Sequence, residues 1–196
     1  MARPRKTDDV ETRARLLAAA EVEFGRHGFD AARLEDVARA AGIRRPSLLY
    51  HFETKHQLYA AVIHECFARL TGAMLAALAA EGSVAERIDA AAVAFQEFTR
   101  THPAIAPLIL REVIDERGPG RALLAQDGAA MLDALEGFVR KHGKGQIRRR
   151  LPVRAAILQL GFGALVRQAS GELRAPLWGP KDELRTLARA LMLEEA

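Results

Sequence analysis

Residues 34–52 read LEDVARAAGIRRPSLLYHF, and no other stretch predicts its local fold so specifically. Apolar side chains recur there at i, i+3, i+4 and i+7, at Leu34, Val37, Ala38 and Ala41. Gly42 can adopt the positive φ of a sharp turn, and Pro46 suits the first turn of a second helix that runs to Phe52. The pattern predicts two short helices joined by a tight turn, a helix-turn-helix.

The second of these helices has the length and the side chains to enter a DNA groove. Eight residues form a helix about 12 Å long, which is comparable with the width of about 12 Å of the major groove. Ile43, Leu48 and Phe52 are predicted to anchor it to the core. The residues predicted to face outward include no acid, and they are Arg45, Ser47, Leu49, Tyr50 and His51. Periodicity alone leaves open an ordinary pair of short helices with a glycine turn.

The remainder of the chain is also predicted to be helical. No stretch alternates apolar and polar residues with period two, and β-branched residues are sparse. Capping-box patterns at 54–57 and 83–86 predict helix starts, and Pro103, Pro152 and Pro180 open three later helices. The chain is therefore predicted to be all-α with about nine helices. Short helices precede long ones, which suggests a domain over 1–55 and a second over 56–196.

Composition indicates a globular chain and excludes several classes of protein. Of 196 residues, 49% are hydrophobic and 28% charged, with a net charge of +4 that permits a polyanionic partner. A single cysteine, Cys66, excludes an internal disulfide and a multi-cysteine metal site. No clean apolar run follows the basic N-terminus. The longest uncharged run, between Arg154 and Arg167, is shorter than a membrane helix requires, so we expect a soluble, cytoplasmic protein.

From Thr12 to Tyr59 the sequence closely resembles the N-terminal domain of the tetracycline-repressor (TetR) family of bacterial regulators. The stretches that carry the resemblance are RLLAAA at 15–20, FGRHG at 24–28, LEDVA at 34–38, AGI at 41–43 and PSLLYHF at 46–52, followed by Lys55. They cover about a quarter of the chain, and the rest matches only in length and helical character. The resemblance implies a transcriptional regulator, most often a repressor, that is released from its operator by a small effector.

The resemblance assigns DNA contacts residue by residue. Arg45, Pro46 and Ser47 begin the recognition helix, where Arg45 is suited to the O6 and N7 atoms of a guanine. Tyr50 and His51 match positions that hold the phosphate backbone. Lys55 is at a helix N-terminus, which is a favourable place for a phosphate.

Three positions depart from the pattern of the family. Arg33 stands where a small hydroxylated residue is common, so it either grips a phosphate or is simply solvated. Arg44 replaces a frequent Ser or Thr cap, which puts the cap of the recognition helix in doubt. Leu49 replaces a common aromatic residue and could contact a thymine methyl group. The basic tail with Arg3, Arg5 and Lys6 either reaches a minor groove or stays disordered.

The resemblance also implies a ligand pocket in the second domain. Large apolar side chains fall on the predicted helices there, at Phe67, Met74, Phe95, Phe98, Met131, Leu135 and Phe138. Met and Phe at helical spacing are more often plain core, but as a set these residues exceed what is needed to close the Ala-rich helices. Nearby polar residues that could orient a mostly apolar effector are Gln96, His102, Arg111 and Glu112. The helix after residue 54 carries Lys55 and Tyr59 at its DNA end and Phe67 and Met74 at its pocket end, so it is the expected mechanical link.

A regulator of this type reads two half-sites as a two-fold dimer. The predicted eighth and ninth helices offer a face for pairing, at Ile157, Gly161, Ala164, Leu184, Leu187 and Leu191. The expected partners are a palindromic operator, a second copy of the chain and a small molecule.

Other motifs give weak signals. His64, Glu65 and Cys66 do not have metal-ligand spacing, and no H-E-x-x-H, P-loop, G-x-S-x-G or CxxC is present. We therefore expect no metal, no cofactor and no enzymatic activity. The segment from Arg140 to Arg150 contains six basic residues and no acid, and is either a solvated loop or a site for an anion or DNA. The rival hypothesis is a helical enzyme or small-molecule carrier with an incidental helix-turn-helix.

Overall fold

A computed structural model describes residues 6–194, and these contain ten α-helices, one short 3-10 helix and no strand. The helices are α1 (Lys6–Ala31), α2 (Leu34–Ala40), α3 (Arg45–His51), α4 (Lys55–Ala79), α5 (Val84–Thr101), α6 (Ile105–Ile114), α7 (Arg121–His142), α8 (Val153–Ala169), η1 (Gly171–Leu173), α9 (Arg174–Trp178) and α10 (Leu184–Met192). This confirms the predicted all-α fold, with the short α9 in addition to the nine helices expected.

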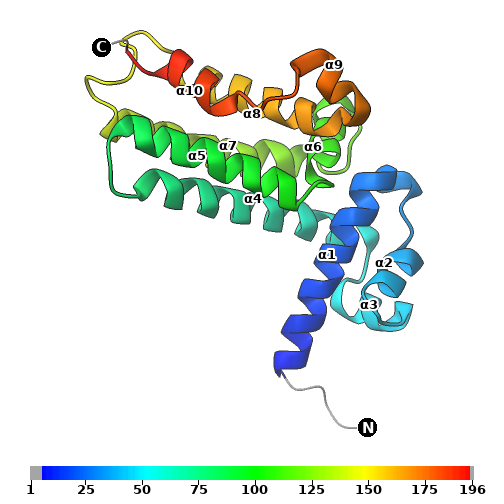
Figure 1. The fold of residues 1–196 in the computed structure, drawn as a ribbon. Helices are drawn as coiled ribbons and strands as arrows, with labels where there is room; N and C mark the ends of the chain where they lie inside the picture. The colour runs from blue at the N-terminus through cyan, green and yellow to red at the C-terminus, as the bar shows by residue number, and fades with distance from the viewer. Residues whose placement is uncertain (1–5, 195–196) are drawn as a thin grey trace.

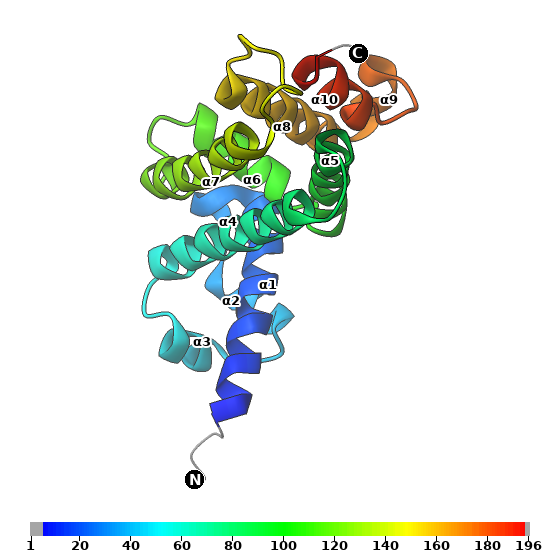
Figure 2. The ribbon, with the colours of Figure 1, turned by 90° about the vertical axis from the view of Figure 1, so that its left-hand side faces the viewer.

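The helices form two lobes (Figures 1 and 2). Helices α1, α2 and α3 make the N-terminal lobe, and α4 leaves it to join a larger bundle with α5, α7, α8 and α10. Helix α6 lies where the lobes meet, because it packs against both α1 and α8. The bundle therefore touches the N-terminal lobe through α4 and α6.

Local sequence explains where several helices begin and bend. At Gly28, which adopts φ 75°, α1 is kinked. The hydroxyl of Thr54 accepts a hydrogen bond from Gln57 N at 3.1 Å and caps α4. Ser83 and Glu86 form a complete capping box at the start of α5. The two predicted capping patterns thus lie at true helix starts.

One hydrophobic core extends through both lobes. Leu16, Phe24 and Leu48 of the N-terminal lobe belong to the same cluster of buried side chains as Leu58 and Ile63 of α4. Because no linker separates this core, a movement of α4 or α6 must displace α1 or repack the cluster.

Helix α4 is long and apolar enough, by length and composition, to cross a membrane. It contains no long uncharged run, because Glu65 and Arg69 lie within it. In the fold, α4 packs against α1, α5 and α7.

Candidate DNA-reading surface and ligand cavity

The predicted helix-turn-helix is formed by α2 and α3. Gly42 adopts φ 71° in the turn between them, and Ile43 N donates to Ala38 O at 2.9 Å. The side chain of Leu48 is fully buried and that of Phe52 nearly so, and both hold α3 against the lobe. The seven residues of α3 give it a length of about 10 Å.

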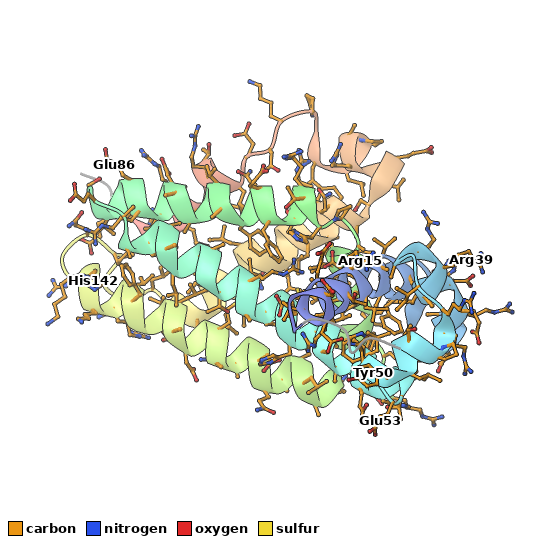
Figure 3. All side chains as sticks on the ribbon, turned by 90° about the horizontal axis from the view of Figure 1, so that it is seen from below. Arg15, Arg39, Tyr50, Glu53, Glu86 and His142 are labelled. Atoms are coloured by element: carbon orange, nitrogen blue, oxygen red, sulfur yellow. The ribbon has the colours of Figure 1, made fainter. Side chains whose placement is uncertain are left out.

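The start of α3 presents the side chains assigned to DNA. Arg44, Arg45, Pro46, Ser47 and Tyr50 are exposed, and Tyr50 is 75% exposed. Figure 3 shows Tyr50 at the same end of the molecule as Arg39, far from Glu86 and His142. The N-caps Arg44 of α3 and Arg33 of α2 make no side-chain cap bond, as their residue types suggested. Both arginines are exposed.

The structure corrects the outward orientation of two residues. Leu49 is only partly exposed and packs against the core, because it shares the inner side of α3 with Leu48. The side chain of His51 is 11% exposed, and its Nε2 lies 3.8 Å from Asp9 Oδ1 of α1. A base contact by Leu49 would therefore require α3 to move. The tail residues Arg3 and Arg5 lie outside the described residues.

Two cations assigned to DNA already have partners in the free chain. Arg45 Nε lies 2.7 Å from Glu35 Oε1, and both side chains are about half exposed. Lys55 Nζ donates to Asp30 O at 3.0 Å and lies 4.7 Å from the centre of the Phe29 ring. Arg45 must therefore give up its contact with the Glu35 carboxylate in order to bind DNA. Lys55 has a structural role as well, because it fixes the start of α4 to the end of α1.

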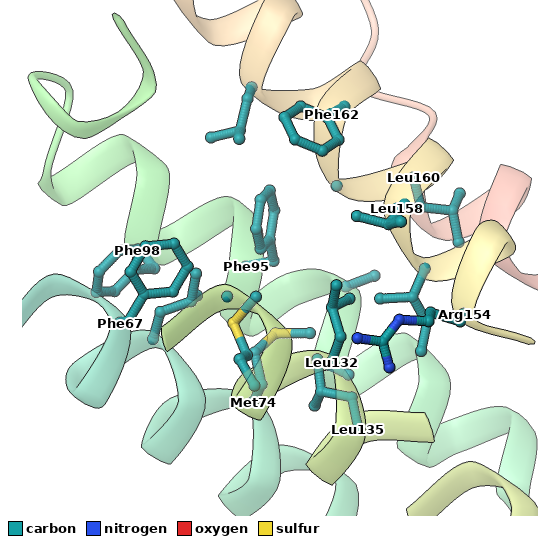
Figure 4. A pocket seen from close by; sticks show the side chains of 18 of the residues that line it. Phe67, Met74, Phe95, Phe98, Leu132, Leu135, Arg154, Leu158, Leu160 and Phe162 are labelled. Carbon is teal, nitrogen blue, oxygen red and sulfur yellow. The ribbon is translucent and has the colours of Figure 1, made fainter. Parts of the chain in front are cut away.

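A cavity of 340 Å³ lies within the bundle (Figure 4). This volume is in the range of small-molecule sites. Six of the residues predicted to line a pocket do line it, and they are Phe67, Met74, Phe95, Phe98, Met131 and Leu135. Of the described residues that line the cavity, only Thr99 and Arg154 have polar side chains. The cavity is therefore suited to an apolar molecule.

The cavity lining does not include the other predicted pocket residues, His102, Arg111 and Phe138, nor the polar Gln96 and Glu112. Phe138 stacks on His142 with ring centres 4.4 Å apart. His102, Arg111 and Glu112 were expected to face the cavity because they lie on or next to its helices. They instead contact Arg69, the carbonyls of α1 and Tyr59 respectively.

Sequence reasoning missed the wall contributed by α8, including Arg154, Leu158 and Phe162. The apolar run between Arg154 and Arg167 was predicted to be a dimer face, and its flanking arginines were not assigned to the pocket. An arginine in the first turn of an apolar helix that contains no acid is the signal that could have identified Arg154.

His102 connects the cavity wall to the N-terminal lobe. Its ring stacks on that of Phe98 at 4.6 Å, and its Nε2 lies 3.1 Å from Arg69 Nη1. Because an arginine only donates, His102 Nε2 must accept here, which places the ring proton on Nδ1. Arg69 Nη2 in turn donates to the buried Glu21 of α1 at 3.0 Å.

Helix α6 makes a second connection between the lobes. Ile109 lines the cavity, and Arg111 and Glu112, further along the same helix, bind groups outside α6. Arg111 Nη1 donates to Gly25 O of α1 at 3.0 Å, and Nη2 donates to Arg26 O at 3.3 Å. These carbonyls belong to the last turn before the kink in α1, where a cation is favourable.

Glu112 is buried and forms the centre of this contact. Its Oε1 accepts from the hydroxyl of Tyr59 on α4, and its Oε2 accepts from Gly120 N at 2.9 Å. Burial and then the Glu112 carboxylate raise the pKa of Tyr59 well above its usual range. Tyr59 therefore remains a neutral donor at physiological pH, and α4, α6 and the start of α7 are locked together.

The face expected to pair with a second copy is oriented differently from the prediction. Ile157, Gly161 and Leu184 line the cavity, Ala164 packs against the core and Leu191 is partly buried. Leu187 is 55% exposed, as a dimer contact should be. The exposed side of α8 instead carries Ala155, Gln159, Gly163 and Val166.

Cys66 is buried, and burial raises the pKa of its thiol to about 12, so it is a poor nucleophile. Residues 6–194 contain no group of three or more His, Cys, Asp or Glu side chains arranged to hold a metal ion. Among the described residues, the two candidate binding sites are the exposed α3 surface and the cavity.

Comparisons with known proteins find sequence similarity over part of the chain. Residues 16–62 match the model of the bacterial regulatory proteins of the tetR family. Over 88 residues (45% of this chain, 40% of the relative) the sequence is 35% identical to the HTH-type transcriptional activator FasR of Mycolicibacterium smegmatis. Over 59 residues (30% of this chain, 27% of the relative) it is 37% identical to the probable acrEF/envCD operon repressor of Escherichia coli. The matches thus span less than half of each relative.

The whole fold also has solved counterparts. The transcriptional regulator FadR from Bacillus subtilis, solved in complex with stearoyl-CoA, superposes with a TM-score of 0.68. The alignment covers 91% of this chain and 94% of that one at 16% identity. At this identity the likeness shows a shared fold, over the bundle as well as the N-terminal lobe.

Proposed function

The chain belongs to the tetR family of bacterial regulatory proteins, and we propose that it is a cytoplasmic, sequence-specific DNA-binding regulator controlled by an apolar effector. The observation that carries the proposal is the pairing of an exposed, acid-free α3 with a closely coupled apolar cavity. Residues 1–55 would bind DNA, and residues 56–196 would bind the effector and a second copy. Relatives include an activator and a repressor by name, and we favour repression relieved by the effector.

In the proposed complex the N-terminal end of α3 enters the major groove. Arg45 leaves Glu35 and donates to a guanine, and Ser47 lies on the same exposed turn. Arg33, Arg44 and Tyr50 are exposed around α3 and are suited to phosphates. Lys55 binds the backbone only if it gives up Asp30 O, so we expect it to contribute less than Arg45.

A dimer would present two copies of α3 to a palindromic operator. We propose that its interface uses the exposed side of α8, with small residues Ala155 and Gly163, together with Leu187 of α10. Leu177 (66% exposed) and Trp178 (39% exposed) of α9 extend this apolar surface. Small residues on α8 allow helices of two copies to approach closely, and the exposed apolar groups would be buried.

The effector would act by favouring one arrangement of the lobes over the other. A molecule that pushes Phe98 or Ile109 displaces His102 or α6, and both connect to α1. The FadR complex with stearoyl-CoA supports the proposal that a long apolar molecule fits a bundle of this fold. Coupling requires different affinities for the two arrangements, and a typical coupling free energy of about 1–3 kcal/mol changes operator affinity about 5- to 150-fold.

The test is binding to the DNA upstream of the chain's own gene, measured by fluorescence anisotropy over a range of salt concentrations. We expect the logarithm of the affinity to fall linearly with the logarithm of salt concentration. Arg45→Ala should cost about 1–3 kcal/mol per half-site and relax specificity at one base pair.

Arg100→Ala is the matched control, because Arg100 is an exposed, carboxylate-paired arginine on α5. It should leave operator binding unchanged. A flat salt dependence, or equal losses in the two variants, would refute the DNA-binding role and favour a small-molecule carrier.

A further inference from the structure

The cavity offers a bound molecule a single charged side chain. Its remaining polar lining group, Thr99, already directs its hydroxyl proton to the carbonyls of Phe95 and Gln96 on its own helix. Arg154, in the first turn of α8, is therefore the sole lining side chain among the described residues with protons free for a ligand.

Arg154 has one edge occupied and one edge open. Its Nη1 lies 2.5 Å from Asp133 Oδ1 and 3.7 Å from Glu136 Oε2, both on α7. Within residues 6–194, its Nε and Nη2 donate to no group. A guanidinium has five N–H donors in a planar fork, so the Nε and Nη2 edge can bind two oxygens of one anionic group.

The position of Arg154 determines the kind of molecule that could use this edge. In Figure 4 it lies at the end of the cavity opposite Phe67 and Phe98, and its guanidinium reaches toward Leu132 and Leu135. The lining residues of α4, α5 and α6 are mostly buried, whereas those of α7 and α8 are mostly partly exposed, so the cavity opens between α7 and α8.

The surroundings of this end favour a negative group. The loop between α7 and α8 follows Arg140 and Lys141 and carries Lys144, Arg148, Arg149 and Arg150, with no acidic residue between 140 and 150. Asp133 and Glu136 are offset by Arg154 and by Arg140, whose Nε donates to Glu136 at 2.8 Å. Glu194 Oε1 also lies at the loop, where it accepts from Arg149 N at 3.1 Å. Basic residues outnumber these three carboxylates, so an anion that reaches this end meets more positive than negative charge.

We propose that the effector is a straight-chain amphipathic acid, with its alkyl chain in the cavity and its anionic end on the Nε and Nη2 edge of Arg154. The inference rests on the proposed role of the cavity as the effector site. Two sources of such a molecule share this chemistry of an alkyl chain that ends in an anion. A free carboxylate binds Arg154 through its two oxygens, whereas an acyl thioester of coenzyme A places one phosphate on Arg154 and its other phosphates against the basic loop.

The experiment measures ligand binding directly by calorimetry on the full chain, without DNA. The probes are laurate, the uncharged alcohol dodecanol, dodecylamine and lauroyl-CoA. Wild type should bind laurate or lauroyl-CoA more tightly than dodecanol, and dodecylamine most weakly. If dodecanol or dodecylamine binds as well as the anions, the proposal is overturned.

Variants then assign the preference to Arg154. Arg154→Gln should weaken the anionic probe about 10- to 100-fold, as expected for loss of a charge-assisted hydrogen bond, and leave dodecanol unchanged. Arg154→Lys should retain part of the preference. Arg100→Gln is the control, since Arg100 is an exposed, carboxylate-paired arginine on α5 that does not line the cavity, and this variant should bind all probes like wild type. Equal weakening of the anion and the alcohol by Arg154→Gln would show a merely structural role.

A loop variant separates the two sources of the anion. Replacing Lys144, Arg149 and Arg150 together with serine should weaken lauroyl-CoA and spare laurate. Failure of this inference is distinct from failure of the proposed function, because the salt dependence of operator binding tests the latter without any ligand.

Discussion

The contact of Tyr59 with Glu112 gives a quantitative prediction about how the lobes are held together. Tyr59→Phe removes one hydroxyl and retains the ring, which packs edge-on against Phe24 at 4.8 Å and Phe29 at 5.1 Å. Glu112 keeps its bond from Gly120 N but has one buried carboxylate oxygen without a donor. A hydrogen bond to a charged group contributes about 1.5–3 kcal/mol, and we expect the free energy of unfolding to fall by that amount.

The chain contains one other tyrosine, which supplies the control. Tyr50 is 75% exposed, so Tyr50→Phe should change the unfolding free energy by less than about 0.5 kcal/mol. Urea denaturation at neutral pH, followed by circular dichroism, measures both variants. Equal unfolding free energies for the two variants would refute the structural role of the contact.

Alkaline pH gives an independent readout. The pKa of Tyr59 is raised in the fold, first by burial and then by Glu112, whereas an unfolded tyrosine titrates near about 10. The contribution of Tyr59 to stability is therefore complete below pH 10 and is lost as pH rises further, by up to about 1.4 kcal/mol per pH unit. Tyr59→Phe should lose stability less steeply than wild type above pH 10, and an unchanged slope would contradict the assignment.

Two further substitutions test the lobe contact and the dimer. Gly25→Ala should lower the free energy of unfolding by about 1–3 kcal/mol, because its Cβ would lie under 3.0 Å from Ala104. Gly72→Ala is the control: its Cβ would have nothing within 4 Å, so it should raise the free energy of unfolding by about 0.5–1 kcal/mol. Thermal melts compare the two variants. Leu187→Asp should give a monomer in light scattering that loses operator affinity. Ile114→Asp, at a still more exposed apolar site on α6, should remain dimeric. A dimeric Leu187→Asp would move the interface elsewhere.

Short-range patterns were sufficient for the helices and for the helix-turn-helix. Gly28, Gly42, Thr54 and Ser83 act within their own turns, through positive φ or a cap bond to a residue three positions away. Apolar periodicity likewise identified Leu48 and Phe52 as anchors of α3. Six of the seven apolar side chains expected at the pocket line the cavity, since only a few positions on each helix can face its neighbours.

Tertiary structure decided the direction in which each helix turns its polar residues. His102, Arg111 and Glu112 lie on helices of the cavity, yet they bind Arg69, the carbonyls of α1 and Tyr59. Their partners are 33 to 87 residues away along the chain, so no local pattern encodes the contacts. The same holds for α8, because an apolar stripe shows that a helix face is removed from water. It does not show whether that face lines a cavity or contacts a second copy. The packing of α8 against α6, α7 and α10 turned Ile157 and Gly161 inward and placed Arg154 at the end of the cavity.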